Sequence, residues 1–183
     1  MPQYQTTIIN EKYLKKCDKL IKTLRDDGVF WVIMNEDPKN LNTFKTIEYL
    51  SKKGLKLKNI ILWINKFNKT LPPIINLHRS ILFFVKSDSY FFNKDQIREK
   101  HIWKDIEWGS RKKNYNPLGK DPGNVWIRTI DDGKGKIIKF DPLNFKEIIE
   151  RIILCSSKKG DFIFINLDSK INLKNFGRKI KNE

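Results

Sequence analysis

The sequence is poor in the residues that build disulfide frameworks and metal sites. Only two of its 183 residues are cysteines, Cys17 and Cys155, and each falls on an apolar helical stripe. This placement favours two small buried side chains over a disulfide. The two histidines, His78 and His101, stand alone without the spacing of zinc ligands, so no zinc site is expected.

Long apolar runs are also absent. Runs such as residues 60–64 and 81–85 are far too short to span a bilayer. The first residues lack the basic-then-apolar layout of a secretory signal and the arginine-rich character of a transit peptide. We therefore expect a protein of the cytoplasm or of an organellar matrix, with no membrane partner.

Positive charge, in contrast, is in excess. Lysine and arginine number 37 against 21 aspartates and glutamates, which gives a formal net charge of +16. Such a balance favours a polyanionic partner, DNA or RNA. A second interpretation stays open, because lysine greatly outnumbers arginine and isoleucine and asparagine are abundant. An AT-rich coding sequence would produce the same bias, and part of the charge would then be compositional.

Apolar periodicity alternates between helical and extended segments. Apolar residues spaced by three and four predict helices over 12–25, over 42–53 with Phe44, Ile47 and Leu50 inward, and over 145–154. Short apolar runs predict buried strands at 29–34, 57–64, 81–86 (with 90–92 pairing against it), 125–130 and 162–165. Residues 131–136 form a loop rich in glycine and charge, and the residues after 165 form a polar, basic tail.

This alternation predicts an α/β sandwich with a mixed, mostly parallel sheet and helices on both faces. Residues 1–183 read as a single domain. From 94 to 123 the apolar period disappears, and charges, tryptophans and a Pro/Gly cluster replace it. We therefore expect 94–123 to be an insert in that domain. Periodicity alone does not select among doubly wound folds.

Two stretches are more specific than the periodicity. Residues 116–126 read Asn-Pro-Leu-Gly-Lys-Asp-Pro-Gly-Asn-Val-Trp, and residues 150–161 read Glu-Arg-Ile-Ile-Leu-Cys-Ser-Ser-Lys-Lys-Gly-Asp. With the segments 24–34, 54–65 and 78–90, in that order, the chain resembles the amino-group DNA methyltransferases of a permuted class. These enzymes place the catalytic half first, then a target-recognition insert, then the cofactor-binding half.

The resemblance implies a Rossmann-like methyltransferase sandwich, incomplete at the C-terminus, with 94–123 as a target-recognition-like insert. It implies methylation of cytosine N4 or adenine N6 in DNA, as in restriction–modification systems, with S-adenosylmethionine as the cofactor. The residues expected to carry the chemistry depart from the family pattern at two places.

The first departure is the catalytic loop, which in the family reads Asp/Ser/Asn-Pro-Pro followed by an aromatic residue. Its polar residue accepts hydrogen bonds from the target amine, and its ring stacks on the flipped base. In this sequence the candidate match is Met1-Pro2-Gln3-Tyr4. Pro2 and Tyr4 fit, so Tyr4 is the candidate catalytic residue of a degenerate loop. The alternative is a frayed terminus with a chance proline and tyrosine.

The second departure is the cofactor loop. The family continues from its Gly-Asp turn through a strand into a glycine-rich loop, whose bare backbone approaches the donor closely. By resemblance, Asp161, Ile165 and Asn166 are the cofactor-binding candidates. No glycine occurs between Asp161 and Gly177, and later strands with the adenosine-binding acid are expected to be missing. These departures predict that no S-adenosylmethionine binds here.

The insert predicts nucleic-acid contacts, because basic side chains neutralise phosphates and aromatic rings stack on exposed bases. The candidates are Arg98, Lys100, Trp103, Lys104, Trp108, Arg111, Lys112, Lys113 and Lys120. A solvated charged loop anchored by its tryptophans is the alternative. The basic tail either contacts phosphates or is a disordered terminus.

Three hypotheses remain at this point. In the first, the protein has lost S-adenosylmethionine binding and catalysis and acts as a nucleic-acid-binding or scaffold subunit, for example of a ribonucleoprotein such as an organellar ribosome. In the second, it is an S-adenosylmethionine-dependent DNA amino-methyltransferase, active alone or with a partner chain. In the third, it is a pairing subunit with a structural role only.

Overall fold

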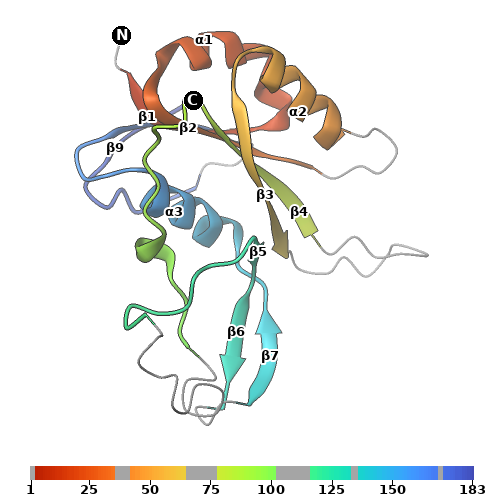
Figure 1. The fold of residues 1–183 in the computed structure, drawn as a ribbon, viewed down its shortest axis with the longest axis vertical. Coiled ribbons are helices and arrows are strands. Elements are labelled where there is room, and N and C mark those ends of the chain that lie inside the picture. The colour runs from red at the N-terminus through yellow and green to blue at the C-terminus, as the bar shows by residue number, and fades with distance from the viewer. Residues whose placement is uncertain (1–2, 36–41, 65–77, 102–115, 133–135, 169–170) are drawn as a thin grey trace.

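A seven-stranded mixed sheet forms the centre of the protein in its computed structural model (Figure 1). The structure describes residues 3–35, 42–64, 78–101, 116–132, 136–168 and 171–183. The strand order is β5-β3-β4-β2-β1-β8-β9. The strands are β1 (Tyr4–Asn10), β2 (Leu24–Ile33), β3 (Lys56–Ile64), β4 (His78–Val85), β5 (Val125–Trp126), β8 (Phe162–Asn166) and β9 (Lys179–Asn182).

Four neighbouring strands of this sheet run in one direction. β1 pairs in parallel with β2 and with β8, and β8 pairs in parallel with β9. β4 is antiparallel to both β2 and β3, whereas β5 is parallel to β3. The expected mixed, mostly parallel sheet is therefore confirmed. The carboxyl ends of β1, β2, β8 and β9 meet at the same edge of the sheet.

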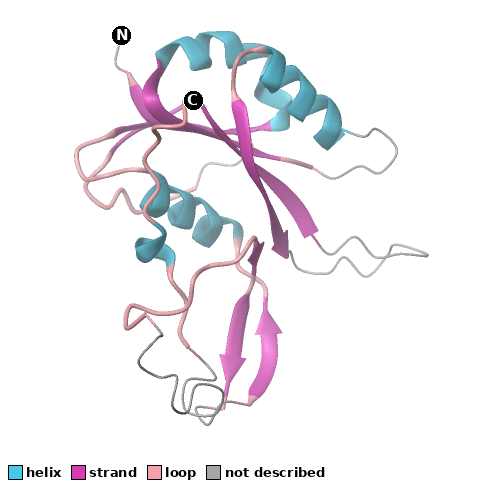
Figure 2. Ribbon diagram, viewed as in Figure 1, coloured by secondary structure: helices cyan, strands magenta, loops and turns pink. Residues whose placement is uncertain are grey.

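Helices cover both faces of the sheet, as Figure 2 shows. One face is covered by η1 (Glu11–Lys16), α1 (Cys17–Thr23) and α2 (Asn42–Lys52), and the other by α3 (Phe145–Ser156). The alternating residues of β2 divide between these layers. Val29, Trp31 and Ile33 lie in the cluster that contains α3, while Phe30 and Val32 lie in the cluster that contains α1 and α2.

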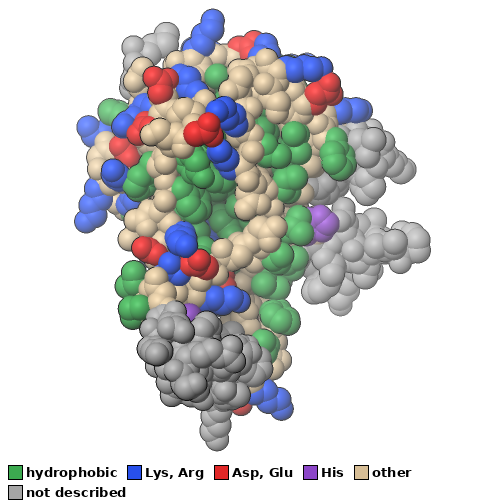
Figure 3. All heavy atoms as spheres, in the orientation of Figure 1, with side chains coloured by type: hydrophobic (Ala, Val, Ile, Leu, Met, Phe, Trp, Pro, Cys, Tyr) green, Lys and Arg blue, Asp and Glu red, His purple; other side chains and the backbone are tan. Residues whose placement is uncertain are grey.

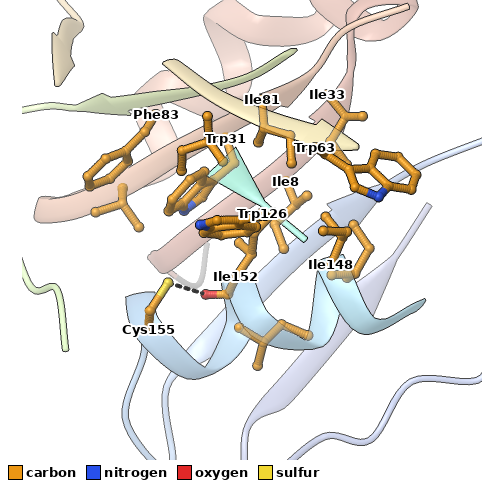
Figure 4. Close-up of a cluster of buried hydrophobic side chains, with 14 of the residues drawn as sticks. Ile8, Trp31, Ile33, Trp63, Ile81, Phe83, Trp126, Ile148, Ile152 and Cys155 are labelled. Atoms are coloured by element: carbon orange, nitrogen blue, oxygen red, sulfur yellow. Dashed lines mark hydrogen bonds between the residues drawn. The ribbon is translucent and has the colours of Figure 1, made fainter. Parts of the chain in front are cut away.

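The α3 face holds the larger apolar cluster, shown in Figure 4. Trp31 stacks on Phe83 with ring centroids 4.4 Å apart, and Trp126 lies 6.3 Å from Trp31. Helix α3 begins at a capping box, in which Asn144 accepts from the backbone N–H of Glu147 and the Glu147 carboxylate accepts from that of Asn144. The cap fixes where the helix starts and therefore which of its residues reach the tryptophans.

The described residues between β4 and α3 include η2 (Lys94–Ile97) and β5, which pairs with β3 at the edge of the sheet. They also include a separate two-stranded hairpin of β6 (Arg128–Asp131) and β7 (Ile137–Asp141), which extends away from the sheet (Figure 1). Residues 102–115 lie outside the described residues. Among the residues that the structure describes, no helix is long and apolar enough to cross a membrane.

Several predicted elements need correction. Phe44 was expected to point inward, but it is 69% exposed, whereas Leu50 is buried. In β3 only Ile61 and Trp63 are fully buried, while Leu57 and Ile60 are half-buried against the other cluster, so β3 is not completely buried on both faces. Residues 90–92 form no strand. Instead, the Tyr90 ring lies against Phe83, with centroids 5.7 Å apart.

Three strands, β1, β7 and β9, were not predicted, and one predicted strand is two separate strands in the structure. β1 and β7 were missed, and the segment 125–130 is divided between β5 and β6. β9 lies in what was expected to be a basic tail. There it pairs in parallel with β8 and leads directly into an acidic residue, Glu183.

Candidate functional site

The carboxyl edge of the parallel strands is the natural place for a ligand, because open α/β sheets bind ligands beyond the carboxyl ends of their strands. The strand register aligns the last residues along this edge. Ile9 is opposite Asn166, and Ile165 is opposite Asn182. The segments that follow β1 and β8 therefore begin side by side, the first from Asn10 and the second from Asn166.

One cavity opens at the ends of β8 and β9. It has a volume of about 430 Å³ and is lined by Ile165, Leu167, Asp168, Ile171, Leu173, Asn182 and Glu183. We call it the β8–β9 cavity. Its walls are mainly aliphatic, with two carboxylates and one carboxamide. An acid directly after the second strand is where Rossmann-type proteins bind ribose hydroxyls.

A second cavity opens beyond β1. It has a volume of about 520 Å³ and lies between η1 and the first turns of α2, where it is lined by Glu11, Lys12, Leu14, Lys15, Asn42, Lys45, Thr46 and Tyr49. We call it the η1–α2 cavity. Three lysines and one carboxylate make its lining basic.

An ion pair joins the linings of the two cavities. The Lys12 ammonium, from the η1–α2 cavity, contacts the carboxylate of Asp168, from the β8–β9 cavity. This hydrogen bond raises the pKa of Lys12, so the side chain stays charged. A second link runs nearby, with Lys16 Nζ 3.6 Å from a carboxylate oxygen of Glu183. The 3₁₀ helix after β1 is thus tied to the ends of both β8 and β9.

Asn10 ends β1 at this edge and is almost completely buried. It occupies the N-cap position of η1, yet its side chain makes no capping hydrogen bond, and its Oδ1 has no hydrogen-bond partner. A buried acceptor without a partner costs about 1–3 kcal/mol, and such groups in native proteins call for an explanation. Asn10 and Tyr13 stand where Asn-x-x-Tyr would place the first and fourth residues of the family's catalytic loop.

The position of Tyr4 does not support its predicted catalytic role. Tyr4 begins β1, at the opposite end of the strand from the ligand edge, and its ring packs edge-on against Phe164 with centroids 5.5 Å apart. Pro2 lies outside the described residues. Asn10 was missed because β1 was missed. The β-branched run of Thr6, Thr7, Ile8 and Ile9 was the signal that could have located it.

The predicted cofactor residues are divided between the two ends of β8. Ile165 lines the β8–β9 cavity and Asn166 is buried at the same edge. Asp161 precedes the strand at the far end, where its carboxylate accepts from the backbone N–H of Lys158 at 2.7 Å and pairs with Arg25 at 3.5 Å. Asp161 therefore caps a turn at the end of the strand away from the cavity.

Arg98 was predicted to contact nucleic acid, but the structure uses it internally. Its side chain is only 6% exposed and bonds to the carboxylates of Asp95 and Asp121 and to the carbonyl of Gly119. A guanidinium held in this way is not available to a phosphate. The candidates Trp103, Lys104, Trp108, Arg111, Lys112 and Lys113 lie outside the described residues.

Lys100 and Lys120 come together at the base of the insert. Both line a cavity of about 240 Å³ with Glu99, Ile127, Arg128, Thr129, Leu143 and Arg151. We call it the Arg151 cavity. The sequence indicated the two lysines but not the two arginines, which belong to β6 and α3.

The Asn116–Trp126 stretch owes its specific residues to packing. Gly119 has φ +120, and a Cβ there would lie 2.4 Å from the Glu99 carbonyl oxygen. Trp126 is 1% exposed and lies beneath the guanidinium of Arg151, whose central carbon is 5.0 Å from the ring centroid. These residues therefore attach the insert to the core.

Comparisons with known proteins agree with this arrangement. The family described as DNA methylase matches residues 3–164. The chain belongs to this family. Type II methyltransferase M.BglII of Bacillus subtilis is 27% identical over 174 residues, and the match covers 88% of this chain and 46% of that protein. Type II methyltransferase M1.MboII of Moraxella bovis is 29% identical over 163 residues, covering 80% and 61%.

This DNA methylase-family chain thus spans about half to three fifths of the length of these two relatives. Solved structures show the fold. The cytosine-N4-specific PvuII DNA methyltransferase aligns with a TM-score of 0.62 at 14% identity, covering all of this chain and 76% of that one. The M1.HpyAVI–SAM complex aligns with a TM-score of 0.61 at 13% identity, covering 99% and 80%.

Proposed function

We propose that this chain is a DNA-binding member of the DNA methylase family that does not transfer methyl groups. The observation that carries the proposal is the absence of glycine between Asp161 and Gly177, where the family has bare backbone beside the donor. The Lys12–Asp168 ion pair lies at the same edge and joins a residue of the η1–α2 cavity to a residue of the β8–β9 cavity.

Transfer needs the amine and the donated methyl in line, with the reacting atoms about 3–3.5 Å apart. No residue of β1 or η1 is among the described residues that line the β8–β9 cavity. A ligand in that cavity is therefore in contact with β8 and β9 rather than with Asn10, although Asn10 lies beside the lining residue Leu167.

The segment after β8 also argues against the complete cofactor. No glycine stands between Asp161 and Gly177, and the side chains of Ile171 and Leu173 form part of the cavity wall. Bare backbone is what lets a loop approach a bound cofactor closely. The residues present suit an adenosine-like group, with Glu183 for ribose hydroxyls, but they do not fit the whole of S-adenosylmethionine.

Nucleic-acid binding rests on charge and on family membership. Lys100 and Lys120 are exposed at the base of the insert, and the whole chain carries a net charge of +16. On the face drawn in Figure 3, basic side chains are spread around the rim and interleaved with acids, so no single basic patch dominates that face. We infer modest, salt-dependent affinity for duplex DNA. The alternative to DNA binding is binding to RNA, which includes incorporation into a ribonucleoprotein.

A second function, DNA amino-methylation, is favoured by one specific observation. Asn10 Oδ1 is buried without a partner at the end of β1, and Asn10 and Tyr13 have the spacing of the polar and aromatic residues in the family's catalytic loop. There it would accept a hydrogen bond from an exocyclic amine, and the ring of Tyr13, three residues later, is the aromatic group available to the base. This function requires the Lys12–Asp168 pair to open, in the chain alone or with a partner chain.

Fluorescence anisotropy with a labelled duplex and with RNA of the same sequence tests the first proposal. We expect binding of DNA whose affinity falls steeply between about 50 and 200 mM salt. Replacing Lys100 and Lys120 with Gln should reduce the salt slope, whereas replacing Lys136 and Lys139, exposed lysines of the hairpin, serves as the matched control. No DNA binding at low salt, or a preference for RNA, would refute the assignment to DNA.

A further inference from the structure

A further cavity lies between helix α1 and the end strand β9, on the face of the sheet that α1 and α2 cover. It has a volume of about 380 Å³. We call it the α1–β9 cavity. Its lining residues come from β1, η1, α1, β8 and β9 or directly follow β9, so hydrogen-bonded elements hold its walls. They are Tyr4, Lys16, Lys19, Leu20, Thr23, Phe164, Lys181 and Glu183.

The floor of the α1–β9 cavity is apolar. Tyr4, Leu20 and Phe164 belong to the apolar cluster beneath α1, and each of them is buried. The Tyr4 and Phe164 rings pack edge to face, with centroids 5.5 Å apart. Because both rings are covered by the core, neither offers a free face on which a nucleic-acid base could stack. The floor therefore suits an aliphatic chain rather than a base.

The rim of the cavity keeps two positive charges without a counter-charge. Lys16 is paired with Glu183, which also belongs to the lining. Lys19 on α1 and Lys181 on β9 have no acidic partner in the part of the chain that the structure describes. Asp18, the acid next to Lys19 in the sequence, pairs with a different lysine. Two ammonium groups on opposite walls are thus available to an anion.

Tyr4 adds a hydrogen-bond donor at the floor. Its side chain is only 5% exposed, and its hydroxyl has no hydrogen-bond partner among the described residues. The hydroxyl keeps some accessible surface, whereas the unpartnered polar atoms Thr7 Oγ1 and Trp31 Nε1 have almost none. Buried tyrosine hydroxyls usually find a partner. A ligand in the cavity would supply the one that Tyr4 lacks.

The dimensions of the cavity limit the ligand to a small molecule. Its volume lies at the lower end of the roughly 300–1,000 Å³ of small-molecule pockets. The lining residues Lys16 and Thr23 mark its length along α1, which is about 10 Å at a helical rise of about 1.5 Å per residue. An acyl chain of medium length would span this distance.

We propose that the α1–β9 cavity binds a carboxylic acid with an aliphatic body, of the class of the medium-chain fatty acids. The carboxylate accepts hydrogen bonds from the Tyr4 hydroxyl and from the ammonium groups of Lys19 and Lys181, and the chain lies against Leu20 and Phe164. The site is independent of the proposed function, because no residue of the insert is among the described residues that line it.

Isothermal titration calorimetry of the whole chain with octanoate tests this site. The controls are 1-octanol, which lacks the carboxylate, and acetate, which lacks the chain, all at equal ionic strength. We expect saturable binding of octanoate, binding of octanol weaker by about tenfold or more, and no binding of acetate. Equal affinities for octanoate and octanol would show that the cavity recognises no carboxylate and would overturn the proposal.

Two variants assign the binding to named groups. Tyr4→Phe keeps the ring and removes only the hydroxyl, and Lys181→Gln removes one charge, so each should weaken octanoate binding by about tenfold. Lys139→Gln, on the exposed hairpin, should leave it unchanged, and circular dichroism checks that every variant is folded. If Tyr4→Phe and Lys181→Gln bind octanoate as tightly as the unaltered protein, the binding is non-specific and the site does not exist.

Methyl NMR signals locate the ligand directly. Saturating octanoate should shift the methyl signals of Leu20, on the cavity floor, and leave those of Ile138, on the exposed hairpin, in place. No shift at Leu20, or equal shifts at Leu20 and Ile138, would place octanoate elsewhere on the protein and refute the assignment.

Discussion

Lys12 and Asp168 form an ion pair across the carboxyl edge of the sheet, between the segment that follows β1 and the segment that follows β8. In a methyltransferase of this family, the target base and the methyl donor would meet at this edge. Here each partner of the pair lines a different cavity. The pair therefore lies between the two cavities at the ligand edge.

The attachment of the insert depends on Trp126. It is 1% exposed, close to Trp31, and stacked under Arg151. We expect Trp126→Ala to reduce the free energy of unfolding by about 3–5 kcal/mol. Chemical denaturation measures this change, and Trp126→Phe, which keeps an aromatic ring, should cost clearly less. If Trp126→Ala lost less free energy of unfolding than Trp126→Phe, the indole ring would not be part of the core.

Two glycines with positive φ allow a matched comparison. Gly119→Ala places a methyl group 2.4 Å from the Glu99 carbonyl oxygen, whereas Gly160→Ala finds no atom within 4 Å. Gly160→Ala should cost only the backbone strain of about 1–3 kcal/mol, and Gly119→Ala should cost more. Thermal melts of the two variants compare them directly, and equal losses would contradict the close approach at Gly119.

The capping box of α3 should contribute measurable stability. Asn144→Ala removes the acceptor for the Glu147 N–H, for which we expect a loss of about 0.5–2 kcal/mol. Lys146→Ala, in the first turn of the same helix, is the control and should have little effect. If urea denaturation gives the two variants equal midpoints, the cap does not stabilise this helix.

The cysteines should be inert in the folded protein. Both are fully buried, and burial raises the pKa of the Cys17 thiol and that of the Cys155 thiol. Because the thiolate is the reactive form, neither should react with a thiol reagent near neutral pH until the protein unfolds. The native protein is incubated with a thiol reagent and examined by mass spectrometry. Rapid labelling of either cysteine would contradict the burial of that residue.

The elements that were predicted well from the sequence are those whose buried residues are apolar. The helix from Phe145 has an uninterrupted isoleucine stripe, and the run 29–34 is apolar throughout. β1 was missed because Gln5, Thr6 and Thr7 read as polar although they are buried. Thr6 donates to the Ser156 carbonyl at 2.7 Å, a partner 150 residues away that no local pattern shows.

β9 was missed for a different reason. It is an edge strand with a single apolar residue, Ile180, between Lys179 and Lys181. Lysines on an edge strand discourage further pairing and hide the strand from a search for apolar runs. Its omission also hid Glu183 at the ligand edge. Similarly, the burial of Arg98 could not be foreseen, because one of its carboxylate partners, Asp121, lies on the far side of the insert.

Methyl incorporation tests the central claim most directly. The purified protein is incubated with S-adenosylmethionine carrying a tritiated methyl group and with a pool of duplex DNA of varied sequence, and the radioactivity of the DNA is counted. We predict incorporation no greater than with heat-denatured protein, because no glycine between Asp161 and Gly177 provides the bare backbone that a loop needs beside the donor. Tritium transferred to DNA above that background, and abolished by Asn10→Ala, would contradict this claim and establish a working methyltransferase.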